Sequence, residues 1–449
     1  MKQWLALTAY GLLMRALWPL LWLRFRRRAR QEPLYGTALA ERYGFYRGQP
    51  TAEAERPIWL HAVSLGETRA AEPLIAALRQ ARPDLRLLLT HGTATGRETG
   101  RALLRDGDQQ RWLPIDSPGA VRRFLARHRP RVGVLMETEV WPALQHAARR
   151  AGVPMLLVNA RLSDKSLRQS LRFDALMRPA AQAITQALAQ TEADAARLRQ
   201  AGAPDVRVSG NLKFDMTPVP ELLRRGQAWR TAAGARPVVL AASWREGEDT
   251  PLLDAWRRAL DQHAASGQPP AERPLLLLVP RHPQRFDEIA QGVTQAGFSL
   301  ARRSSWGPAA ADAVPPDADR TADVWLGDSM REMPAYYAAA DVALLGGSFA
   351  PLGGQNLIEA AACGCPVVMG PHTFNFAEAA TLAEAQGAAQ RVAGMSEGVA
   401  QAVALASHDS ARAAAVEAAG HFAGAHRGAA ARMAAAVLAA AGLTSAAGR

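Results

Sequence analysis

The stretch Asp341–Phe376, DVALLGGSFAPLGGQNLIEAAACGCPVVMGPHTFNF, decides the fold because it contains a strand, a glycine-rich loop, the start of a helix and a second strand. Val342–Leu345 is a short apolar run, and the glycines after it let a backbone approach a ligand closely. Asn356 then opens a helix that carries Glu359 in its first turn, where a carboxylate can accept hydrogen bonds from sugar hydroxyls. The pattern indicates a βαβ unit with a nucleotide-sugar site. A glycine-rich turn that only packs helix against strand is the alternative.

Outward from this unit, apolar runs alternate with helical patterns in two successive blocks of the chain. The expected strands are, in the first block, Ile58–Val63, Leu85–Thr90, Val132–Met136, Met155–Val158 and Val206–Val208, and, in the second, Val238–Ala242, Leu275–Val279, Val324–Leu326, Val342–Leu345 and Pro366–Met369. Such alternation is typical of parallel sheets covered by helices on both faces. The sequence therefore predicts an α/β protein with two Rossmann-like domains that face a central cleft, with ligands at the carboxyl ends of the strands.

Length and composition agree with two domains. A chain of 449 residues with 49% hydrophobic content is large enough for two cores, since single cores stop growing at about 250–300 residues. Segment 214–236, which holds prolines and a charged stretch, is the expected linker between an N-terminal domain at 31–213 and a C-terminal domain at 237–449. The alanine-rich tail of the second domain is expected to be helical. The two cysteines are too few for a disulfide framework or a metal site.

The net charge of +12 comes almost entirely from arginine, since lysine occurs only at Lys2, Lys165 and Lys213. No zinc-finger spacing, heptad series or mixed aromatic and basic run accompanies this charge, so no nucleic-acid partner is expected. Two D-x-D patterns, at 106–108 and 317–319, resemble the way in which some sugar-transferring enzymes hold a divalent ion. Neither follows an apolar strand, and we therefore expect no metal ion.

The amino terminus differs in kind, because Trp4–Leu23, WLALTAYGLLMRALWPLLWL, is followed at once by RFRRRAR. It reaches the ~20 residues that a helix needs to cross hydrocarbon, and the arginines after it predict that the body of the protein lies in the cytoplasm. Arg15 and Pro19 weaken a spanning helix, so a helix that lies in the membrane interface is the alternative. Residues 1–30 are predicted to anchor the protein to an anionic bilayer, with a buried domain helix as the competing interpretation.

The first of four polar strand ends is Ser64-Leu65-Gly66-Glu67, which follows the run Ile58–Val63. Ser64 and Glu67 match the S-x-x-E capping box, in which the serine and the glutamate satisfy each other's backbone donors. A cap does not need Gly66, whereas a carboxylate presented to a substrate benefits from a neighbour without a side chain. Glu67 is therefore a candidate general base, with helix capping as the alternative role.

The other three strand ends also carry charged groups. Glu137 and Glu139 lie between an apolar strand and a helix start, where either acid would favour the helix dipole even without a further role. Arg161 and Lys165 belong to a polar loop and are candidates for phosphate contacts, although a solvated loop would have the same composition. Arg281 is restrained between prolines and suits a phosphate or carboxylate fork, with a simple turn as the alternative.

Together these segments resemble one family, the 3-deoxy-D-manno-octulosonic acid (Kdo) transferases of lipopolysaccharide assembly, which are glycosyltransferases of GT-B fold. The matching motifs are, in chain order, IWLHAVSLGE, METEVWP, VNARLSDKS, SGNLKF, VPRHPQRF, LGDSMREM and GGQNLIEAAACGCPVVMGPHTFNF. They extend from Ile58 to Phe376, and the resemblance also covers the amino-terminal anchor. It implies transfer of Kdo from CMP-Kdo to a lipid A precursor (lipid IVA), with inversion at the anomeric carbon and without metal or cofactor. The place of action would be the cytoplasmic face of the inner membrane.

The resemblance also implies roles by motif position. Glu67 would take the proton from the acceptor hydroxyl, Glu137 would be a second required acid in the acceptor domain, and Arg161 and Lys165 would remain candidates for acceptor phosphates. The residues that fall where the family binds CMP are Arg281, His282, Met330, Arg331, Glu332, Met333, Asn356, Leu357, Ile358 and Glu359. Gln355 departs from the histidine expected in many relatives. A sugar-nucleotide epimerase of the same architecture is the alternative enzyme, and a membrane-tethered two-lobed binding protein is the non-enzymatic alternative.

Overall fold

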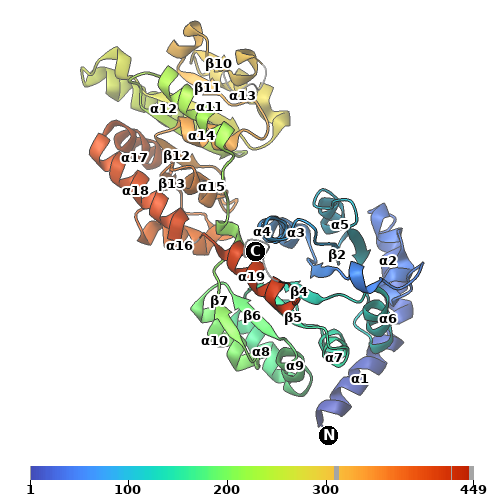
Figure 1. Ribbon diagram of the computed structural model, residues 1–449. Coiled ribbons are helices and arrows are strands. Elements are labelled where there is room, and N and C mark those ends of the chain that lie inside the picture. The colour runs from blue at the N-terminus through green and yellow to red at the C-terminus, as the bar shows by residue number, and fades with distance from the viewer. Residues whose placement is uncertain (1, 308–312, 426, 444–449) are drawn as a thin grey trace. The chain divides into compact units, whose positions relative to one another are not determined.

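The computed structural model describes residues 2–307, 313–425 and 427–443 of the chain, which divides into two compact units. Unit 1 comprises Met1–Asp215 together with Arg427–Arg449, and unit 2 comprises Met216–His426. Within the described residues, each unit holds a seven-stranded sheet whose paired strands are all parallel (Figure 1). The predicted α/β class with two Rossmann-like domains is confirmed.

The sheet of unit 1 has the strand order β3-β2-β1-β4-β5-β6-β7, which is the doubly wound order of Rossmann folds. Its strands are β1 (Ile58–His61), β2 (Leu87–His91), β3 (Gln109–Trp112), β4 (Val132–Met136), β5 (Met155–Ala160), β6 (Gln186–Ala189) and β7 (Val206–Val208). Ile58 is paired with Leu87 on one side and with Val132 on the other. The carboxyl ends of β1, β2 and β4 therefore lie at one edge of the sheet.

Helices cover both faces of this sheet. They are α3 (Leu65–Ala70), α4 (Glu72–Ala81), α5 (Ala94–Arg101), α6 (Pro118–His128), α7 (Pro142–Arg150), α8 (Asp164–Arg172), α9 (Asp174–Gln182) and α10 (Glu192–Ala201). Leu60 on β1 belongs to the apolar cluster that contains Leu74 of α4. Trp59, the preceding residue, belongs to a second cluster with Phe124 of α6 and Leu144 of α7. Successive side chains of β1 thus enter opposite layers of the core.

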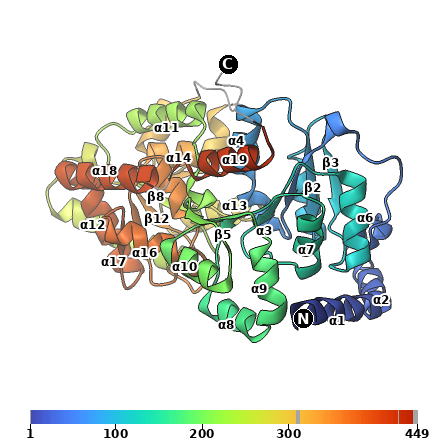
Figure 2. The same ribbon diagram turned by 60° about the horizontal axis from the view of Figure 1, so that its bottom comes forward.

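The core of unit 1 is completed by α19 (Ala429–Ala440), although all of unit 2 precedes this helix in the chain. α19 lies beside α4 (Figure 2), and its Met433 joins the same apolar cluster. The carboxylate of Asp215 accepts a hydrogen bond from the backbone N–H of Ala430 in the first turn. The prediction that assigned all of 237–449 to the second domain is wrong for this helix, because an alanine-rich amphipathic pattern does not indicate which sheet its apolar face covers.

The predicted linker at 214–236 is also revised. It contains α11 (Pro220–Ala232), which packs against α14 (Met333–Ala339) within unit 2. The two helices approach so closely that a Cβ on Gly226 would lie 2.2 Å from the carbonyl oxygen of Ala335. Because a Cβ cannot be accommodated at that distance, the contact depends on glycine. α11 is an element of unit 2 and not a connector.

The sheet of unit 2 has the strand order β10-β11-β9-β8-β12-β13-β14. Its strands are β8 (Val238–Trp244), β9 (Leu275–Pro280), β10 (Leu300–Arg302), β11 (Val324–Leu326), β12 (Val342–Leu345), β13 (Val367–Met369) and β14 (Ala389–Arg391). The chain moves outward in one direction from β8 through β9 and in the other from β12 through β13. The strand order therefore reverses between β8 and β12, which is where ligands bind in open α/β sheets.

The remaining helices of unit 2 cover its sheet. They are α12 (Asp249–Ala265), α13 (Phe286–Gln295), α15 (Leu357–Ala362), α16 (Ala377–Ala385), α17 (Met395–Ser407) and α18 (Asp409–Ala425). Trp244 at the end of β8 and Trp256 of α12 are fully buried in one apolar cluster with Val399 of α17. The βαβ unit expected around Asp341–Phe376 is present as β12, α15 and β13.

The amino terminus forms two helices, α1 (Lys2–Ala16) and α2 (Trp18–Arg28), with a bend of 48° between them. Pro19 lies in the first turn of α2 and lacks the N–H that would continue the hydrogen-bond ladder of α1. Among the described residues, no single helix has the length and apolarity to cross a membrane, although the bent pair meets that test when its helices are taken together. The single helix expected over Trp4–Leu23 is therefore corrected to a bent pair.

α1 is docked on unit 1. The hydroxyl of Tyr10 donates a hydrogen bond to the carboxylate of Asp116 at 2.9 Å. Gly11 is buried where a Cβ would lie 3.0 Å from the Cγ of Pro118, and the helix also packs against α7 and α9. The large apolar side chains that α1 leaves exposed are those of Trp4, Leu5, Leu12 and Leu13.

Candidate active site

Glu67 lies in the first turn of α3, just beyond the carboxyl end of β1. The hydroxyl of Ser64, the N-cap, accepts a hydrogen bond from Glu67 N at 3.4 Å and donates one to Glu67 Oε1 at 3.3 Å. Glu67 Oε2 accepts a hydrogen bond at 2.7 Å from the N–H of Val63. In a standard capping box this carboxylate would bond the N–H of Ser64. The capping box is therefore present in a shifted form, with the N–H of Val63 in place of that of Ser64, and it fixes the orientation of the carboxylate.

Three acidic side chains interact at the adjacent ends of β1 and β4. Burial raises the pKa of the Glu67 carboxyl, the hydrogen bond from Val63 lowers it, and the charge of Glu137 raises it. Burial also raises the pKa of Glu139 to about 7, and the charges of Glu67 and Glu137 act in the same direction. Because carboxylates shift each other's pKa only at short range, the structure brings these acids into one cluster.

Glu137 is held in an unusual backbone conformation by its surroundings. Its φ of 58° lies in the left-handed region, which non-glycine residues adopt mainly where the surrounding structure requires it. The Glu137 carboxylate accepts a hydrogen bond from Arg161 Nε at 2.9 Å and forms an ion pair with Arg161 Nη2 at 2.7 Å. Arg161 is 59% exposed at its side chain, and Lys165 is exposed in the first turn of α8. Both predicted phosphate contacts thus face solvent, but Arg161 already has a carboxylate partner.

Asn159, at the end of β5, is a structural residue of this region that sequence reasoning did not single out. It is buried with a φ of 50°, and its Oδ1 accepts a hydrogen bond from the N–H of Leu212 at 3.0 Å. Its carbonyl oxygen accepts a second one from Gln190 Nε2 at 2.9 Å, and Gln190 Oε1 accepts one from Asn211 Nδ2. These bonds fix the SGNLKF segment beside the strand end. Asparagine is the residue type that best tolerates a left-handed backbone, which is the one available sequence signal.

In unit 2, Arg281 follows the carboxyl end of β9 and Glu359 lies in the first turn of α15. The two side chains are close enough for their charges to interact. Burial raises the pKa of the Glu359 carboxyl, and the charge of Arg281 lowers it. The Arg281 side chain is exposed, while its N–H donates a hydrogen bond to the carbonyl oxygen of Trp244 at 2.9 Å. His282 lies with its Nε2 3.7 Å from Glu246 Oε1. A cation and an acid that accepts hydrogen bonds are therefore available together.

The glycine-rich loop after β12 is organised by Glu248, a second residue that the sequence did not reveal. This buried carboxylate accepts hydrogen bonds from the N–H groups of Arg245 at 3.2 Å, Gly347 at 2.8 Å, and Phe349 and Ala350 at 3.0 Å each. At Gly346, the neighbouring glycine, a Cβ would lie 2.5 Å from two carbonyl oxygens of β8. The loop is thus rigid and closely apposed to the strand end, as a binding loop requires.

The start of α15 uses its predicted residues in different ways. Asn356 is the N-cap, with its Oδ1 accepting a hydrogen bond from the N–H of Ile358 at 3.2 Å. The side chains of Leu357 and Ile358 are buried in the core. The side chains of these two residues are therefore withdrawn from a ligand, and the Asn356 amide is engaged through its Oδ1 and, at 3.2 Å, through its Nδ2 with Met216 Sδ, whereas Glu359 offers a side-chain carboxylate.

The predicted residues of segment 330–333 also differ in their exposure to solvent. Met330 is 57% exposed, and Arg331 is exposed with a φ of 65°. Glu332 is instead buried, and its carboxylate is bound by Arg225, by Arg303 at 3.1 Å and by the hydroxyl of Ser329. The expectation of a direct ligand contact by Glu332 is therefore revised, because all these bonds commit its carboxylate to holding the segment in place.

The second acid of each D-x-D pattern has a structural partner. Asp108 accepts hydrogen bonds from Arg79 Nη2 at 2.5 Å and from Leu87 N at 2.8 Å, and Asp319 accepts one from Trp306 Nε1 at 2.9 Å. Across residues 2–307, 313–425 and 427–443, the side chains of His, Cys, Asp and Glu form no group of three that has the geometry to hold a metal ion.

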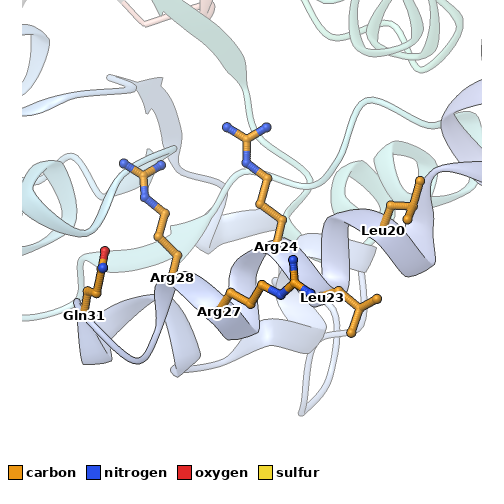
Figure 3. Close-up of a pocket in the computed structure, with 6 residues that line it drawn as sticks. All are labelled: Leu20, Leu23, Arg24, Arg27, Arg28 and Gln31. Atoms are coloured by element: carbon orange, nitrogen blue, oxygen red, sulfur yellow. The ribbon is translucent and has the colours of Figure 1, made fainter.

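Outside the strand ends, α2 carries a basic and apolar surface. One hollow in this surface is lined by Leu20, Leu23, Arg24, Arg27, Arg28 and Gln31. Figure 3 shows the side chains of Arg24 and Arg28 rising on the same side of the helix, with Arg27 lying along it. A second hollow shares Leu23 and Arg27 with the first and adds Arg26 and Arg30.

Two doubly wound parallel sheets define the GT-B fold class, which the chain shares with solved sugar-nucleotide enzymes. UDP-GlcNAc 2-epimerase from Neisseria meningitidis bound to UDP-GlcNAc is one of these, with a TM-score of 0.51 and 15% sequence identity over 85% of this chain and 99% of that one. At this level of identity the likeness concerns the fold alone. The fold class therefore does not distinguish the predicted transferase from the epimerase alternative.

Sequence relatives make that distinction. The family model described as 3-Deoxy-D-manno-octulosonic-acid transferase (kdotransferase) matches residues 37–216. The 3-deoxy-D-manno-octulosonic acid transferase of Bordetella pertussis is 52% identical over 391 residues, which are 85% of this chain and 87% of that protein. The enzyme of the same name from Haemophilus influenzae is 36% identical over 78% of each chain. The chain belongs to the 3-deoxy-D-manno-octulosonic acid transferase family and is a glycosyltransferase, as the motifs predicted.

Proposed function

We propose that this enzyme transfers Kdo from CMP-Kdo to a lipid A precursor such as lipid IVA, with inversion at the anomeric carbon and without a metal ion or cofactor. The observation that carries the proposal is the Glu67 carboxylate, which is oriented by Val63 and Ser64 at a strand end and has a raised pKa. Inversion in a single displacement requires one base beside the attacking hydroxyl, and this carboxylate meets that need.

Glu67 acts in this proposal as the general base. Its Oε2 stays on the N–H of Val63, while its Oε1 releases the weak bond from Ser64 and accepts the proton of the acceptor hydroxyl. A raised pKa makes the carboxylate a stronger base as long as it stays ionised at the working pH. Gly66 supports this role, since a Cβ there would meet open space apart from the Ser64 hydroxyl at 3.9 Å.

Glu137 and Arg161 form the second part of the acceptor site in this proposal. The charge of Glu137 raises the pKa of Glu67, and Arg161 holds the Glu137 carboxylate in place. The largely exposed guanidinium of Arg161 retains N–H donors for a phosphate of the acceptor, and the exposed Lys165 adds a second cation. Arginine is well suited to such a shared position because its planar group can bond two anions in different directions.

Unit 2 is proposed to bind CMP-Kdo. Glu359 accepts hydrogen bonds from the ribose hydroxyls, and Arg281 pairs with the phosphate or with the carboxylate of Kdo. His282, Met330, Arg331 and Met333 line the same ligand, with backbone contacts from Asn356, Leu357 and Ile358. The rigid loop held by Glu248 supports this assignment, because a leaving phosphate is stabilised best by donors that are already in place.

α1 and α2 are proposed to hold the enzyme on the cytoplasmic face of the inner membrane, where its lipid acceptor lies. The exposed Trp4 and leucines of α1 suit the acyl region, and the arginines of α2 suit anionic headgroups. The hydrogen bond from Tyr10 to Asp116 and the burial of Gly11 favour helices that lie in the interface over helices that cross the bilayer.

One experiment tests the reaction as a whole. The full-length chain in detergent is incubated with CMP-Kdo and lipid IVA, with EDTA in a parallel sample, and lipid products are analysed by mass. The expected result is a lipid heavier by one or more Kdo residues in both samples, together with released CMP. Binding without product would indicate the two-lobed binding protein, and loss of product with EDTA would contradict the metal-independent mechanism.

A further inference from the structure

Arg42 is a buried arginine that contacts both α2 and the strand-end loops of unit 1. It belongs to a short 3₁₀ helix, Leu39–Tyr43, and is only 4% exposed. Its guanidinium carbon lies 4.1 Å from the ring centre of Phe25 on α2 and 3.9 Å from that of Trp112 at the end of β3. The cation is therefore enclosed by aromatic faces, one of which comes from α2.

From Arg42, a series of hydrogen bonds leads to Glu67. Arg42 Nη2 donates to the carbonyl oxygen of Gly92 at 3.2 Å. The N–H groups of Gly92 and Thr93 both donate to the carbonyl oxygen of Val63 at 3.0 Å. The N–H of Val63 donates to Glu67 Oε2 at 2.7 Å. A Cβ on Gly92 would lie 2.8 Å from Val63 Cγ1, so the two loops are in close contact.

Packing alone does not explain an arginine at this position. Burial lowers the pKa of Arg42 to about 10, so the side chain keeps its charge at neutral pH. The nearby carboxylate of Glu41 accepts a hydrogen bond from Trp112 N at 3.0 Å and lies 3.5 Å from nitrogens of both Arg97 and Arg111. A leucine would fill the space between aromatic rings without the cost of removing a charge from water. The guanidinium is needed for its hydrogen bond to Gly92.

We infer that Arg42 is a positioning residue for the transfer reaction: it fixes the Gly92 turn, and through Val63 it orients the Glu67 carboxylate, while Phe25 ties this arrangement to α2. The inference rests on the proposed role of Glu67 as the base. It links α2, the helix with the arginine-lined hollow, to the residue that takes the proton. Nothing in this arrangement requires Arg42 to touch either substrate.

The test uses Arg42→Lys in the full-length chain, assayed with CMP-Kdo and lipid IVA. Lysine keeps the charge but cannot stack between the rings and reach Gly92 with the same geometry. We expect kcat to fall about 10- to 100-fold, with KM for CMP-Kdo unchanged. The hydrogen bond from Val63 lowers the pKa of Glu67. Weakening it raises that pKa, so the acidic limb of the pH–rate profile moves to higher pH.

Two further variants separate positioning from folding. Arg123→Lys is the matched control, because Arg123 also stacks on an aromatic ring, that of Phe45 at 4.4 Å, and donates to a backbone carbonyl, that of Tyr43. It should leave kcat and the pH profile at wild-type values. Phe25→Leu keeps an apolar contact but removes one ring face, and it should lower kcat by a few-fold with the pH limb displaced in the same direction.

The outcomes separate this inference from the proposed function. If Arg42→Lys retains the wild-type kcat, or loses activity and thermal stability together without any displacement of the pH limb, Arg42 is structural and the inference is overturned. If Glu67→Gln retains activity, the proposed base is wrong, whatever Arg42 does. An inactive Glu67→Gln with a displaced limb in Arg42→Lys supports both.

Discussion

Units 1 and 2 share one sheet architecture but equip their strand ends differently. In unit 1, the ends of β1 and β4 carry the ionisable side chains of Glu67, Glu137 and Glu139; burial, together with the charges of neighbouring acids in this group, raises the pKa of Glu67 and of Glu139. In unit 2, the loop after β12 carries glycines and N–H groups that a buried Glu248 fixes in place. A carboxylate whose pKa is raised suits proton transfer, whereas a fixed backbone suits the binding of a ligand of given shape. One fold thus supports two kinds of chemistry through the residues that follow its strands.

The largest effect is expected for Glu67, the proposed general base of unit 1. Glu67→Gln keeps the size of the side chain and its ability to accept from Val63, but it cannot take a proton. We expect kcat to fall by about 10²- to 10⁴-fold, while calorimetry shows unchanged CMP binding. Activity within a few-fold of wild type would leave Glu67 with its capping role alone.

The next effect concerns the fixed backbone of unit 2. Glu248→Ala leaves the N–H groups of Gly347, Phe349 and Ala350 buried without their acceptor, which should lower the free energy of unfolding by about 3 kcal/mol and weaken CMP binding. Glu248→Gln keeps one acceptor oxygen and should cost less. Chemical denaturation of the two variants checks this order, and equal stability of both with wild type would show that the loop does not depend on the carboxylate.

A smaller effect is expected for Glu359, the acid proposed to bind the ribose in unit 2. Glu359→Ala removes an acceptor for ribose hydroxyls and should weaken CMP binding about tenfold, in line with the loss of one or two hydrogen bonds. Glu378→Ala, at an exposed position in the first turn of α16, is the matched control and should bind CMP as wild type does. Isothermal titration calorimetry measures both, and identical affinities would remove Glu359 from the proposed site.

The smallest effect is a pH dependence of stability caused by Glu139. Because burial raises the pKa of Glu139 from its ordinary 4.5 to about 7 in the folded protein, the folded state holds a proton between these pH values that the unfolded state has released. Stability should therefore fall as pH rises from about 5 to 7 and level off above, by about 1 kcal/mol once partial exposure is allowed for. Glu139→Gln should flatten this part of the curve. Thermal unfolding from pH 5 to pH 8 checks it, and equal slopes would contradict the shared acidic cluster.

Much of the fold followed from the sequence, because buried parallel strands are continuous apolar runs. Val132–Met136, Val324–Leu326 and Val342–Leu345 were predicted with their observed bounds. The strands that were missed include β3 and β10, with the sequences QQRW and LAR. Both lie at the edge of a sheet and are only partly buried, so they carry no apolar run. Propensity and periodicity are weakest for such short edge strands.

The candidate site was predictable only where the chemistry lies in the side chain next to a strand. Arg281 follows β9 directly and Glu67 lies in the first turn of the helix after β1, and both were singled out in this way, although their binding and catalytic roles stay predictions. Glu248 was not found, because its partner Gly347 is 99 residues away in the chain. Glu332 was assigned to the ligand because its motif position does not show the burial that surrounds it with Arg225 and Arg303. Contacts between distant segments are not encoded in any local pattern.

The return of α19 to the sheet of unit 1 has a consequence for synthesis of the protein. The core of unit 1 lacks one of its covering helices until residues 429–440 have left the ribosome, whereas unit 2 is complete in the chain before then. During synthesis, the apolar face of α4 therefore stays uncovered while unit 2, which precedes α19 in the chain, is made and folds. Deletion of the last helix should accordingly affect solubility of the half that was made earliest.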